Sequence, residues 1–371
     1  MSNKRLPIFT SFSGQGGVER MVLNLVEEFA RQGIKIDLLA LKANSDHLKQ
    51  LPESVNLIRL KAKHSSTVVS ELAQYLKRNQ PEVMLVAKDR PGRAALKARK
   101  KAAVETRIVI RLGTNLSAAL AHKPGWQRWL RAQPLKRGYL GVDHIVPVSQ
   151  GVAEDTAKVT GLPLDRMTVI RNPVITPAML GASSQRPQHR WFSQDKVPVI
   201  LAAGRLTVQK DFTTLLKAFA HLQKQTPAYL IIIGDGALRQ ELEDLIGQLG
   251  MKESVDLPGF QSNPHAWMKA ADLFVLSSRW EGSPNVLTEA IALGTAVVST
   301  DCPSGPVELL QQGKFGRLVP VGDVKALASA MHQTLENPLD AETLKLAASE
   351  YTAENSANHY WQVLYPQTKD K

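Results

Sequence analysis

Short apolar runs of the kind found in buried strands alternate along this chain with segments whose apolar residues recur every three or four positions. The run at 5–12 predicts a strand. The next segment predicts a helix that ends near Gly33, because its apolar residues share one helical face: Val18, Met21, Val22, Leu25, Val26 and Phe29. Further strand-like runs follow at 34–41, 81–87, 106–112 and 144–149. This alternation indicates the α/β class, with a parallel sheet that carries helices on both faces.

The same pattern starts again in the second half of the chain. A segment rich in Pro, Ser and Gly at 172–195 is predicted to be a linker. After it, helical segments separate strand-like runs at 197–206, 228–236, 254–260, 272–278 and 295–301. We therefore expect two doubly wound domains, 1–175 and 176–354, facing each other across a central cleft. Ligands of such sheets bind at the carboxyl ends of the strands.

Positive charge is concentrated in the first half of the chain. The formal net charge is +12, but residues 1–150 alone hold 26 Lys and Arg against 11 Asp and Glu. The basic residues concentrate between 88 and 137, and large apolar side chains lie among them or next to them, namely Trp126, Trp129, Leu130 and Tyr139. This combination suits the surface of an anionic membrane, although a solvated basic helix with its tryptophans in the core is an alternative. No helix-turn-helix, RNP-like or zinc-finger pattern is present, so we expect no nucleic-acid partner.

The cysteine count and the lack of long apolar runs exclude several kinds of protein. Cys302 is the only cysteine, which excludes a disulfide scaffold and a zinc site built on several cysteines. The first residues lack a signal-peptide core, and no run approaches the roughly 18 apolar residues of a membrane-spanning helix. We therefore expect a cytoplasmic protein that is peripheral on the inner face of the membrane.

Three turns that contain glycine follow predicted strands, where the backbone can approach a phosphate closely. The first, at 14–17, is not the GxGxxG fingerprint, and no acidic residue ends the second strand, so a dehydrogenase is disfavoured. The second, at 204–206, places Arg205 and the nearby Lys210 where two cations could hold a diphosphate. The third, at 234–236, leaves room for a base or a ribose. Each of the three is also compatible with a plain turn.

The segment RWEGSPNVLTEA at 279–290 is the most specific motif. Ser283 is a good N-cap and Pro284 fits the first helical position, so we expect a helix that stops at Gly294. Glu281 then lies on the preceding loop, and Glu289 lies more than one turn into the helix. One carboxylate could bind a sugar hydroxyl and the other a ribose, whereas Glu289 could instead be a charge on the helix surface.

This motif resembles that of the retaining family-4 glycosyltransferases of the GT-B class, whose signature is two glutamates separated by seven residues. Other segments agree in the same order, namely GGVER, GRLTVQKDF, IIIGDGALRQEL, LPGF and DCPSGPVELLQQGKFGRLVPVGD. The resemblance implies two Rossmann-like domains and a hexosyltransferase that keeps the anomeric configuration. It implies a nucleoside-diphosphate sugar as donor, with UDP favoured, and a lipid-linked or cell-surface glycan as acceptor in polysaccharide or lipopolysaccharide synthesis. No metal or other cofactor is implied.

The resemblance also implies roles for individual residues. Glu281 would contact the transferred sugar, and Arg205 and Lys210 would stabilise the departing diphosphate, because fixed cations there lower the barrier. Glu289 would hold the donor ribose. The other expected donor-binding residues are Gly16, Gly17, Gly234, Gly236, Phe260, Gly282, Ser283, Asn285 and Val286.

One departure concerns a histidine that many relatives carry after a late strand of the first domain. The corresponding stretch at 111–116 has none, so we expect Arg111, Thr114 or Asn115 to bind the sugar or the acceptor. The missing histidine favours one alternative, a non-catalytic protein that binds nucleotide sugars or glycans. A nucleotide-sugar epimerase of the same fold is a second, although such enzymes do not usually carry this glutamate spacing. A C-terminal helix at about 355–371 is expected to pack back on the first domain.

Overall fold

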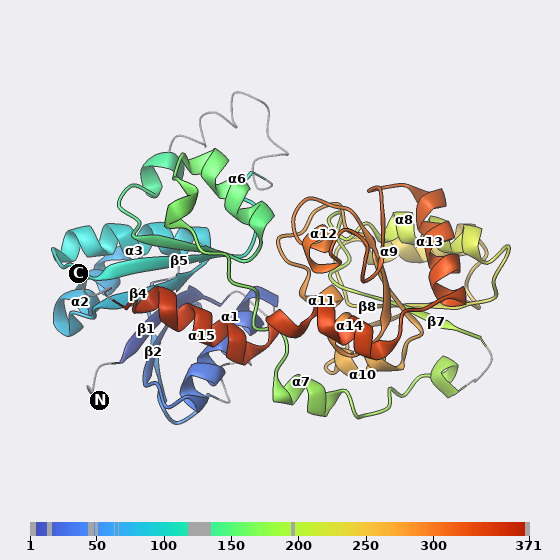
Figure 1. The fold of residues 1–371 in the computed structure, drawn as a ribbon, viewed down its shortest axis with the longest axis horizontal. Helices are drawn as coiled ribbons and strands as arrows, with labels where there is room; N and C mark the ends of the chain where they lie inside the picture. The colour runs from blue at the N-terminus through green and yellow to red at the C-terminus, as the bar shows by residue number, and fades with distance from the viewer. Residues whose placement is uncertain are drawn as a thin grey trace. The chain divides into compact units, whose positions relative to one another are not determined.

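The structure is a computed structural model, and it describes residues 5–12, 17–43, 48, 51–62, 64–65, 67–117, 135–193 and 197–367. The chain divides into two compact units (Figure 1). Unit 1 comprises Met1–Pro173 together with Ala353–Lys371, and unit 2 comprises Val174–Thr352. The chain thus leaves unit 1 after Pro173 and returns to it at Ala353, whereas the sequence pattern placed the domain limits at 175 and 354.

Unit 1 is built on a parallel sheet. Its strands are β1 (Leu6–Ser11), β2 (Ile36–Leu41), β3 (Val55–Arg59), β4 (Val83–Ala87), β5 (Arg107–Leu112) and β6 (His144–Pro147). Their order across the sheet is β3-β2-β1-β4-β5-β6. The order reverses between β1 and β4, and this switch point is where doubly wound sheets place their ligands.

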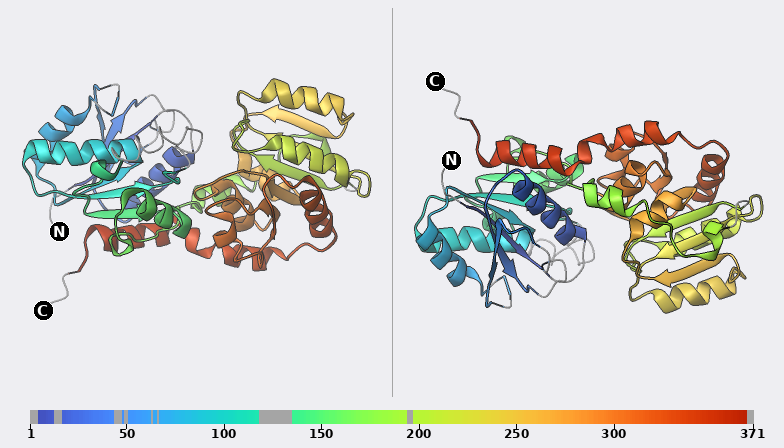
Figure 2. Two further views of the ribbon diagram at one scale, coloured as in Figure 1. Left: turned by 90° about the horizontal axis from the view of Figure 1, so that it is seen from above. Right: turned by 90° about the horizontal axis from the view of Figure 1, so that it is seen from below.

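Helices cover both faces of this sheet, so its strands are apolar on both sides. They are α1 (Gly17–Arg31), α2 (Val69–Asn79), α3 (Asp89–Ala102), α6 (Gln150–Thr160) and α15 (Ala353–Leu364), with a 3-10 turn at Leu164–Arg166. Ile8, Leu38 and Leu85 align across three strands and pack with α1 and α15. The next residues along each strand, Phe9, Leu39 and Val86, face α2 and α3. Figure 2 shows these helix pairs on opposite sides of the sheet.

The last helix, α15, completes unit 1. Tyr360 and Leu364 are buried in the same cluster as the apolar face of α1. The Trp361 ring meets the Phe29 ring of α1 edge to face, with centroids 6.3 Å apart. The Ser356 hydroxyl donates to the Arg171 carbonyl at 2.9 Å. The 19 residues from Ala353 to Lys371 are therefore a structural part of the unit that the first 173 residues begin.

Unit 2 repeats the architecture. Its parallel strands are β7 (Val199–Ala203), β8 (Tyr229–Ile233), β9 (Val255–Gly259), β10 (Leu273–Leu276), β11 (Ala296–Thr300) and β12 (Arg317–Val319). Their order, β12-β11-β10-β7-β8-β9, again reverses once, between β7 and β10. The helices are α7 (Pro177–Ala182), α8 (Phe212–Leu222), α9 (Arg239–Gln248), α10 (Pro264–Ala270), α11 (Asn285–Ala292), α12 (Pro306–Leu309), α13 (Val324–Glu336) and α14 (Ala341–Ala347), with 3-10 turns at Arg190–Ser193 and Ser349–Tyr351. The expected α/β class with two doubly wound sheets is confirmed.

The segment predicted as a linker has structure of its own. Thr176 caps α7 by accepting from the backbone N–H of Met179 at 3.1 Å. Farther along, Trp191 is buried and stacks on Tyr229 of β8 with ring centroids 4.4 Å apart. The linker prediction is therefore wrong for much of 172–195. Its high Pro and Ser content marks helix starts and turns, and one tryptophan anchors it to unit 2.

Candidate functional site

Two loops meet at the switch point of unit 2, one after β7 and one after β10. The Lys210 ammonium lies 2.7 Å from Oε1 of Glu281, and the Ser278 hydroxyl donates to the same oxygen at 2.7 Å. Both charged side chains are largely withdrawn from solvent, with 16% and 9% of their surface exposed. Two residues that the sequence named separately thus form one ion pair where a doubly wound sheet binds its ligand.

Further hydrogen bonds hold the two loops in register. The backbone N–H of Arg279 donates to the Gln209 carbonyl at 2.8 Å, and the Gln209 amide donates to the Trp280 carbonyl at 2.9 Å. The Ser277 hydroxyl donates to the Lys210 carbonyl at 2.8 Å. The Arg279 guanidinium pairs with Asp211 at 2.9 Å. These contacts fix the positions of Lys210 and Glu281 before any ligand arrives, and none of them was predicted.

The glycines at 234 and 236 allow a close approach between the β7 loop and the β8 loop. Gly234 has φ +134°, and a Cβ there would lie 2.0 Å from the Gly204 carbonyl oxygen. A Cβ at Gly236 would lie 2.5 Å from the Leu206 carbonyl oxygen. The Leu206 N–H also donates to the Asp235 carbonyl at 3.0 Å. The glycines therefore have a packing role here, and the loop that they support leaves Arg205 exposed.

The start of α11 differs from the prediction. The helix begins at Asn285 with Pro284 as its N-cap, and no side chain caps it. The expected capping role of Ser283 is therefore wrong. A neighbouring turn packs closely on this loop, since a Cβ on Gly305 would lie only 2.5 Å from the Pro284 ring and 3.2 Å from Cα of Ser283. In the loop before the helix, Gly282 and Pro284 are buried and Ser283 is half-buried.

Glu289 lies on the buried side of α11, with 5% of its surface exposed. Its Oε1 is 3.7 Å from Nε2 of His265 on α10, and that nitrogen makes no hydrogen bond to the described residues. Sequence reasoning missed His265, because only the packing of α10 against α11 brings it to Glu289. The alternative in which Glu289 is a surface charge is excluded by its burial.

Phe260 follows β9 at the same edge of the sheet. The Gly234 N–H donates to the Gly259 carbonyl at 2.9 Å, so Phe260 neighbours the β8 loop. Its ring is 64% exposed, which is unusual for a large apolar side chain. An open ring beside a glycine loop offers a surface on which a planar base can stack.

Cys302 supports a prediction about reactivity. The thiol is buried, and burial together with the nearby Glu281 carboxylate raises its pKa to about 12. Because the thiolate is the reactive form, roughly one thiol in ten thousand is ionised at pH 8, so iodoacetamide should label the native protein far more slowly than a free cysteine. Mass spectrometry of labelled protein measures this, with the same protein in denaturant as control. Equal labelling rates before and after unfolding would contradict the packing around Cys302.

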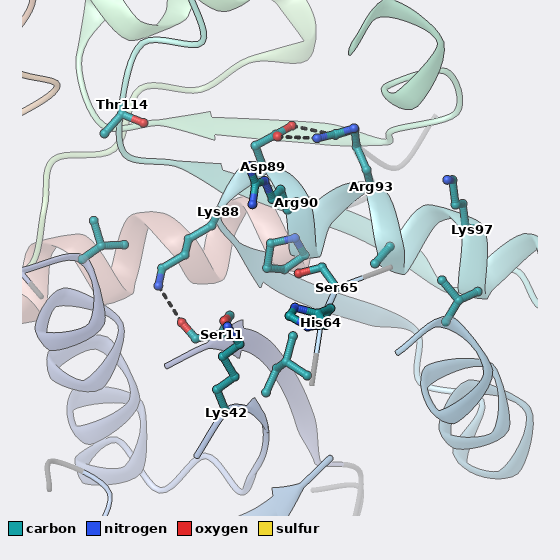
Figure 3. Close-up of a pocket in the computed structure, with 15 residues that line it drawn as sticks. Ser11, Lys42, His64, Ser65, Lys88, Asp89, Arg90, Arg93, Lys97 and Thr114 are labelled. Atoms are coloured by element: carbon teal, nitrogen blue, oxygen red, sulfur yellow. Dashed lines mark hydrogen bonds and ion pairs between the residues drawn. The ribbon is translucent and has the colours of Figure 1, made fainter. Parts of the chain in front are cut away.

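A pocket of about 820 Å³ lies at the carboxyl ends of β1, β2 and β4 in unit 1 (Figure 3). Its polar lining is strongly basic and includes Lys42, His64, Lys88, Arg90, Arg93 and Lys97, with Asp89 as the acid. Thr114, an expected acceptor contact, also lines the pocket and is exposed. Asn115 is half-buried next to it in the chain.

Arg111 occupies a different place from the one expected. Its guanidinium is buried and donates to Oδ1 of Asn172 at 2.5 Å, and burial lowers its pKa. It lies beside the Tyr360 phenol of α15 and close to the backbone of Gly113. The structure thus makes Arg111 an interior residue that joins β5 to the end of unit 1, which argues against a contact with the acceptor.

Three other expected residues lie at helix starts. Gly17 is the exposed first residue of α1, and Asn285 and Val286 are half-buried at the start of α11. Gly16, Trp126, Trp129 and Leu130 lie outside the described residues. Tyr139 is fully buried and donates to Asp89 at 3.0 Å, so its expected place at a membrane interface is wrong.

Two features are absent from the described part of the chain. Within it, no helix combines the length and the apolar character that crossing a bilayer requires. The same residues contain no cluster of three or more His, Cys, Asp or Glu side chains that could hold a metal ion.

Comparison with known proteins assigns each unit. The model of "Glycosyltransferase Family 4" matches residues 15–176, and that of "Glycosyl transferases group 1" matches residues 184–353. One relative is the N-acetylgalactosamine-N,N'-diacetylbacillosaminyl-diphospho-undecaprenol 4-alpha-N-acetylgalactosaminyltransferase of Campylobacter jejuni. It is 29% identical over 93% of this chain and 92% of its own length. The lipopolysaccharide core biosynthesis glycosyltransferase LpsE of Rhizobium meliloti is 27% identical over 87% of this chain and 86% of its own.

Solved structures share the fold over nearly the whole chain. The lipopolysaccharide outer core galactosyltransferase WaaB has a TM-score of 0.73 at 21% identity, covering 97% of this chain and 98% of its own. Anabaena Alr3699/HepE in complex with UDP has a TM-score of 0.78 at 18% identity, covering 97% and 99%. With a glycosyltransferase family model on each unit and relatives aligned over most of both chains, this chain belongs to the glycosyltransferases of the GT-B fold.

Proposed function

We propose that this glycosyltransferase moves a sugar from a UDP-sugar to a lipid-linked or cell-surface glycan, keeping the anomeric configuration and using no metal. The observation that carries the proposal is the Lys210–Glu281 pair at the switch point of unit 2, beside the exposed Arg205. The printed names of the relatives support the acceptor class, since one acts on a diphospho-undecaprenol glycan and another in lipopolysaccharide core synthesis. The UDP in the HepE complex supports the nucleotide.

Each residue of the pair has a distinct task in this proposal. When the bond between the anomeric carbon and the phosphate oxygen breaks, the phosphate keeps the electron pair and its negative charge grows. Lys210 and Arg205 stabilise that charge, and they need little reorganisation because the Glu281 contact already positions Lys210. The acceptor hydroxyl bonds to the anomeric carbon and gives its proton to the departing phosphate. Glu281 holds the sugar while these bonds change.

The rest of the donor is bound around this centre. Glu289 holds the ribose hydroxyls, and the open ring of Phe260 stacks on the base. The backbone at 282–286 contributes N–H groups at the start of α11, where a helix leaves its first amides without intrahelical partners. Because Gly234 and Gly236 carry no side chain, the donor can approach the backbone of the β8 loop closely.

Thermal unfolding in the presence of nucleotides tests the donor site. We expect UDP to raise the melting temperature more than GDP or ADP do, and the shift to persist in EDTA. A ligand at 100 times its Kd stabilises the folded state by about 2.7 kcal/mol, which is readily measured. Proton NMR of the first product then reports whether the anomeric configuration is kept. If no nucleotide shifted the transition, or if EDTA abolished the shift, the corresponding part of the proposal would be lost.

The basic first half supports a second part of the proposal, attachment to an anionic membrane surface on the cytoplasmic side. Residues 1–150 hold 26 Lys and Arg against 11 Asp and Glu, and this excess of positive charge favours binding to acidic lipid headgroups. Sedimentation with vesicles that contain phosphatidylglycerol should recover the protein at low salt and release it at high salt. Recovery no greater than with neutral vesicles would remove this part and leave the donor site untouched.

A further inference from the structure

The basic pocket of unit 1 lies at a switch point of its own, between β1 and β4. The charged residues of the proposed donor site, in contrast, all belong to unit 2. Its volume of about 820 Å³ is within the range of small-molecule sites, roughly 300–1,000 Å³. Apolar side chains complete the wall, namely Val18, Leu41, Val69, Pro91 and Ala94. The pocket therefore has room for a ligand with both a charged and a less polar part.

The charges of this pocket are not balanced. The Asp89 carboxylate is already ion-paired, because the Arg93 guanidinium binds both of its oxygens, at 2.9 and 2.7 Å. The Lys88 ammonium is already paired too, since it contacts the Ser11 carbonyl at 2.5 Å (Figure 3). It also lies 3.1 Å from Oε1 of Glu19.

Three further cations, Lys42, Arg90 and Lys97, have no ion-pair partner among the described residues. All three are exposed around the same pocket. The acids of the pocket are thus already neutralised, and about three positive charges remain for an incoming ligand.

The backbone adds to this preference for an anion. The fourteen-residue helix α3 starts at Asp89, and its first turn lines the pocket. A helix start carries partial positive charge and amides without intrahelical partners. Lys88, the N-cap, has φ +78°, a conformation that costs energy for any residue other than glycine. That strained backbone places the Lys88 side chain at the pocket and aims the start of α3 into it.

We propose that this pocket binds a phosphate or diphosphate group carried by the sugar acceptor. The inference rests on the proposed transfer reaction, and it adds that the acceptor is recognised through phosphate. A neutral glycan would leave three cations without a counter-charge, and a single carboxylate would balance one of them. A diphosphate brings two or three negative charges, more than a single carboxylate, and the planar Arg90 guanidinium can bind two phosphate oxygens at once. The less polar wall then receives what the phosphate is attached to.

Binding of phosphate probes to the full chain tests the proposal. The protein is first saturated with UDP in EDTA, so that the donor site is filled. Inorganic pyrophosphate, geranyl diphosphate and glucose 6-phosphate are then titrated by calorimetry. We expect pyrophosphate to bind to the UDP-loaded protein, with a Kd that weakens as salt is added. Geranyl diphosphate and glucose 6-phosphate separate the two sources of the group, because tighter binding of the first indicates a lipid diphosphate and of the second a phosphorylated glycan.

Matched variants on one helix locate the binding. Lys97 lines the pocket, whereas Lys100, also exposed on α3, does not. Lys97→Gln, alone or with Arg90→Gln, should weaken pyrophosphate binding about tenfold per lost cation, as expected for charge-assisted contacts. Lys100→Gln removes the same charge and should change the Kd less than twofold. UDP affinity should be unchanged in all variants, which also reports that they fold.

Three results would overturn the inference. They are no pyrophosphate binding to the UDP-loaded protein, displacement of pyrophosphate by UDP, and equal weakening by the Lys97 and Lys100 substitutions. In each of them UDP still binds, so the proposed transfer reaction stands. Loss of UDP binding by the unmodified protein would instead refute the donor site, and the two failures are therefore distinguishable.

Discussion

Replacing Lys210 with alanine should lower kcat for sugar transfer by about 10²- to 10³-fold, the usual effect of removing one group that stabilises charge in a transition state. The negative charge that grows on the departing diphosphate would lose a cation fixed in place before the reaction begins. The change should affect kcat more than the KM for the donor, because the interaction strengthens as the bond breaks. Steady-state kinetics with a UDP-sugar and its acceptor measure both quantities.

Two controls make this result interpretable. Lys217→Ala removes an exposed lysine on α8 and should leave kcat within twofold. Because Lys210 is paired with a nearly buried carboxylate, its removal could also destabilise unit 2. Arg205→Ala avoids that difficulty, since Arg205 is exposed, and it should also lower kcat while the melting temperature is preserved. If folded Lys210→Ala and Arg205→Ala both transferred sugar at the normal rate, the proposed role of these cations would be wrong.

Substituting Gly234 with alanine should reduce the free energy of unfolding by about 4 kcal/mol or more, which places it among the most damaging single changes. Two costs add at this position. The backbone has φ +134°, which L residues rarely adopt, and the new methyl group would lie 2.0 Å from the Gly204 carbonyl oxygen. The oxygen cannot move away easily, because the Gly204 N–H is bound to the Ile233 carbonyl at 3.0 Å. Urea unfolding measures the loss, and hydrogen exchange over β7 and β8 locates it.

Gly250 is a matched control for this prediction. It also has a positive φ, +69°, but a Cβ there would meet nothing within 4 Å. Gly250→Ala should therefore cost only the conformational strain, about 1–2 kcal/mol. The difference between the two variants isolates the contact between the β7 and β8 loops. Equal losses in both would mean that this contact is looser than the structure shows.

Local patterns were sufficient to predict the class of the fold and most of its strands, but not β3 and β12, which are short and partly exposed. Strands such as β1 are buried on both faces, so they stand out as apolar runs between helical segments, as at Ile8 and Phe9. The order of the strands required the structure, because pairs such as β1 and β4 join segments more than seventy residues apart. The segment at 172–195 was misread for a related reason. Whether a stretch rich in proline packs or stays open depends on a partner such as Tyr229, which lies far away in the sequence.

The candidate site was predictable only as a set of separate residues. Sequence motifs identified Lys210, Glu281 and Glu289, and the resemblance supplied their roles. The contact between Lys210 and Glu281, however, depends on two loops about seventy residues apart. Arg111 was named for its place in the stretch without the family histidine, and Tyr139 for its aromatic ring among cations, but both are buried. His265 was missed because nothing near it in sequence indicates that it lies against Glu289.

The return of α15 to unit 1 has a consequence for the order in which the protein is made. A ribosome adds about 5–20 residues per second, so the segment from Val174 to Thr352 takes roughly 10–35 s to synthesise. During that time the first 173 residues are complete except for the helix that covers Phe29 and its neighbours. Unit 2 is contiguous and can finish folding on its own, whereas unit 1 must wait for α15 to leave the exit tunnel. The half that starts first is thus the half that is finished last, with an uncovered apolar face that the growing chain carries until then.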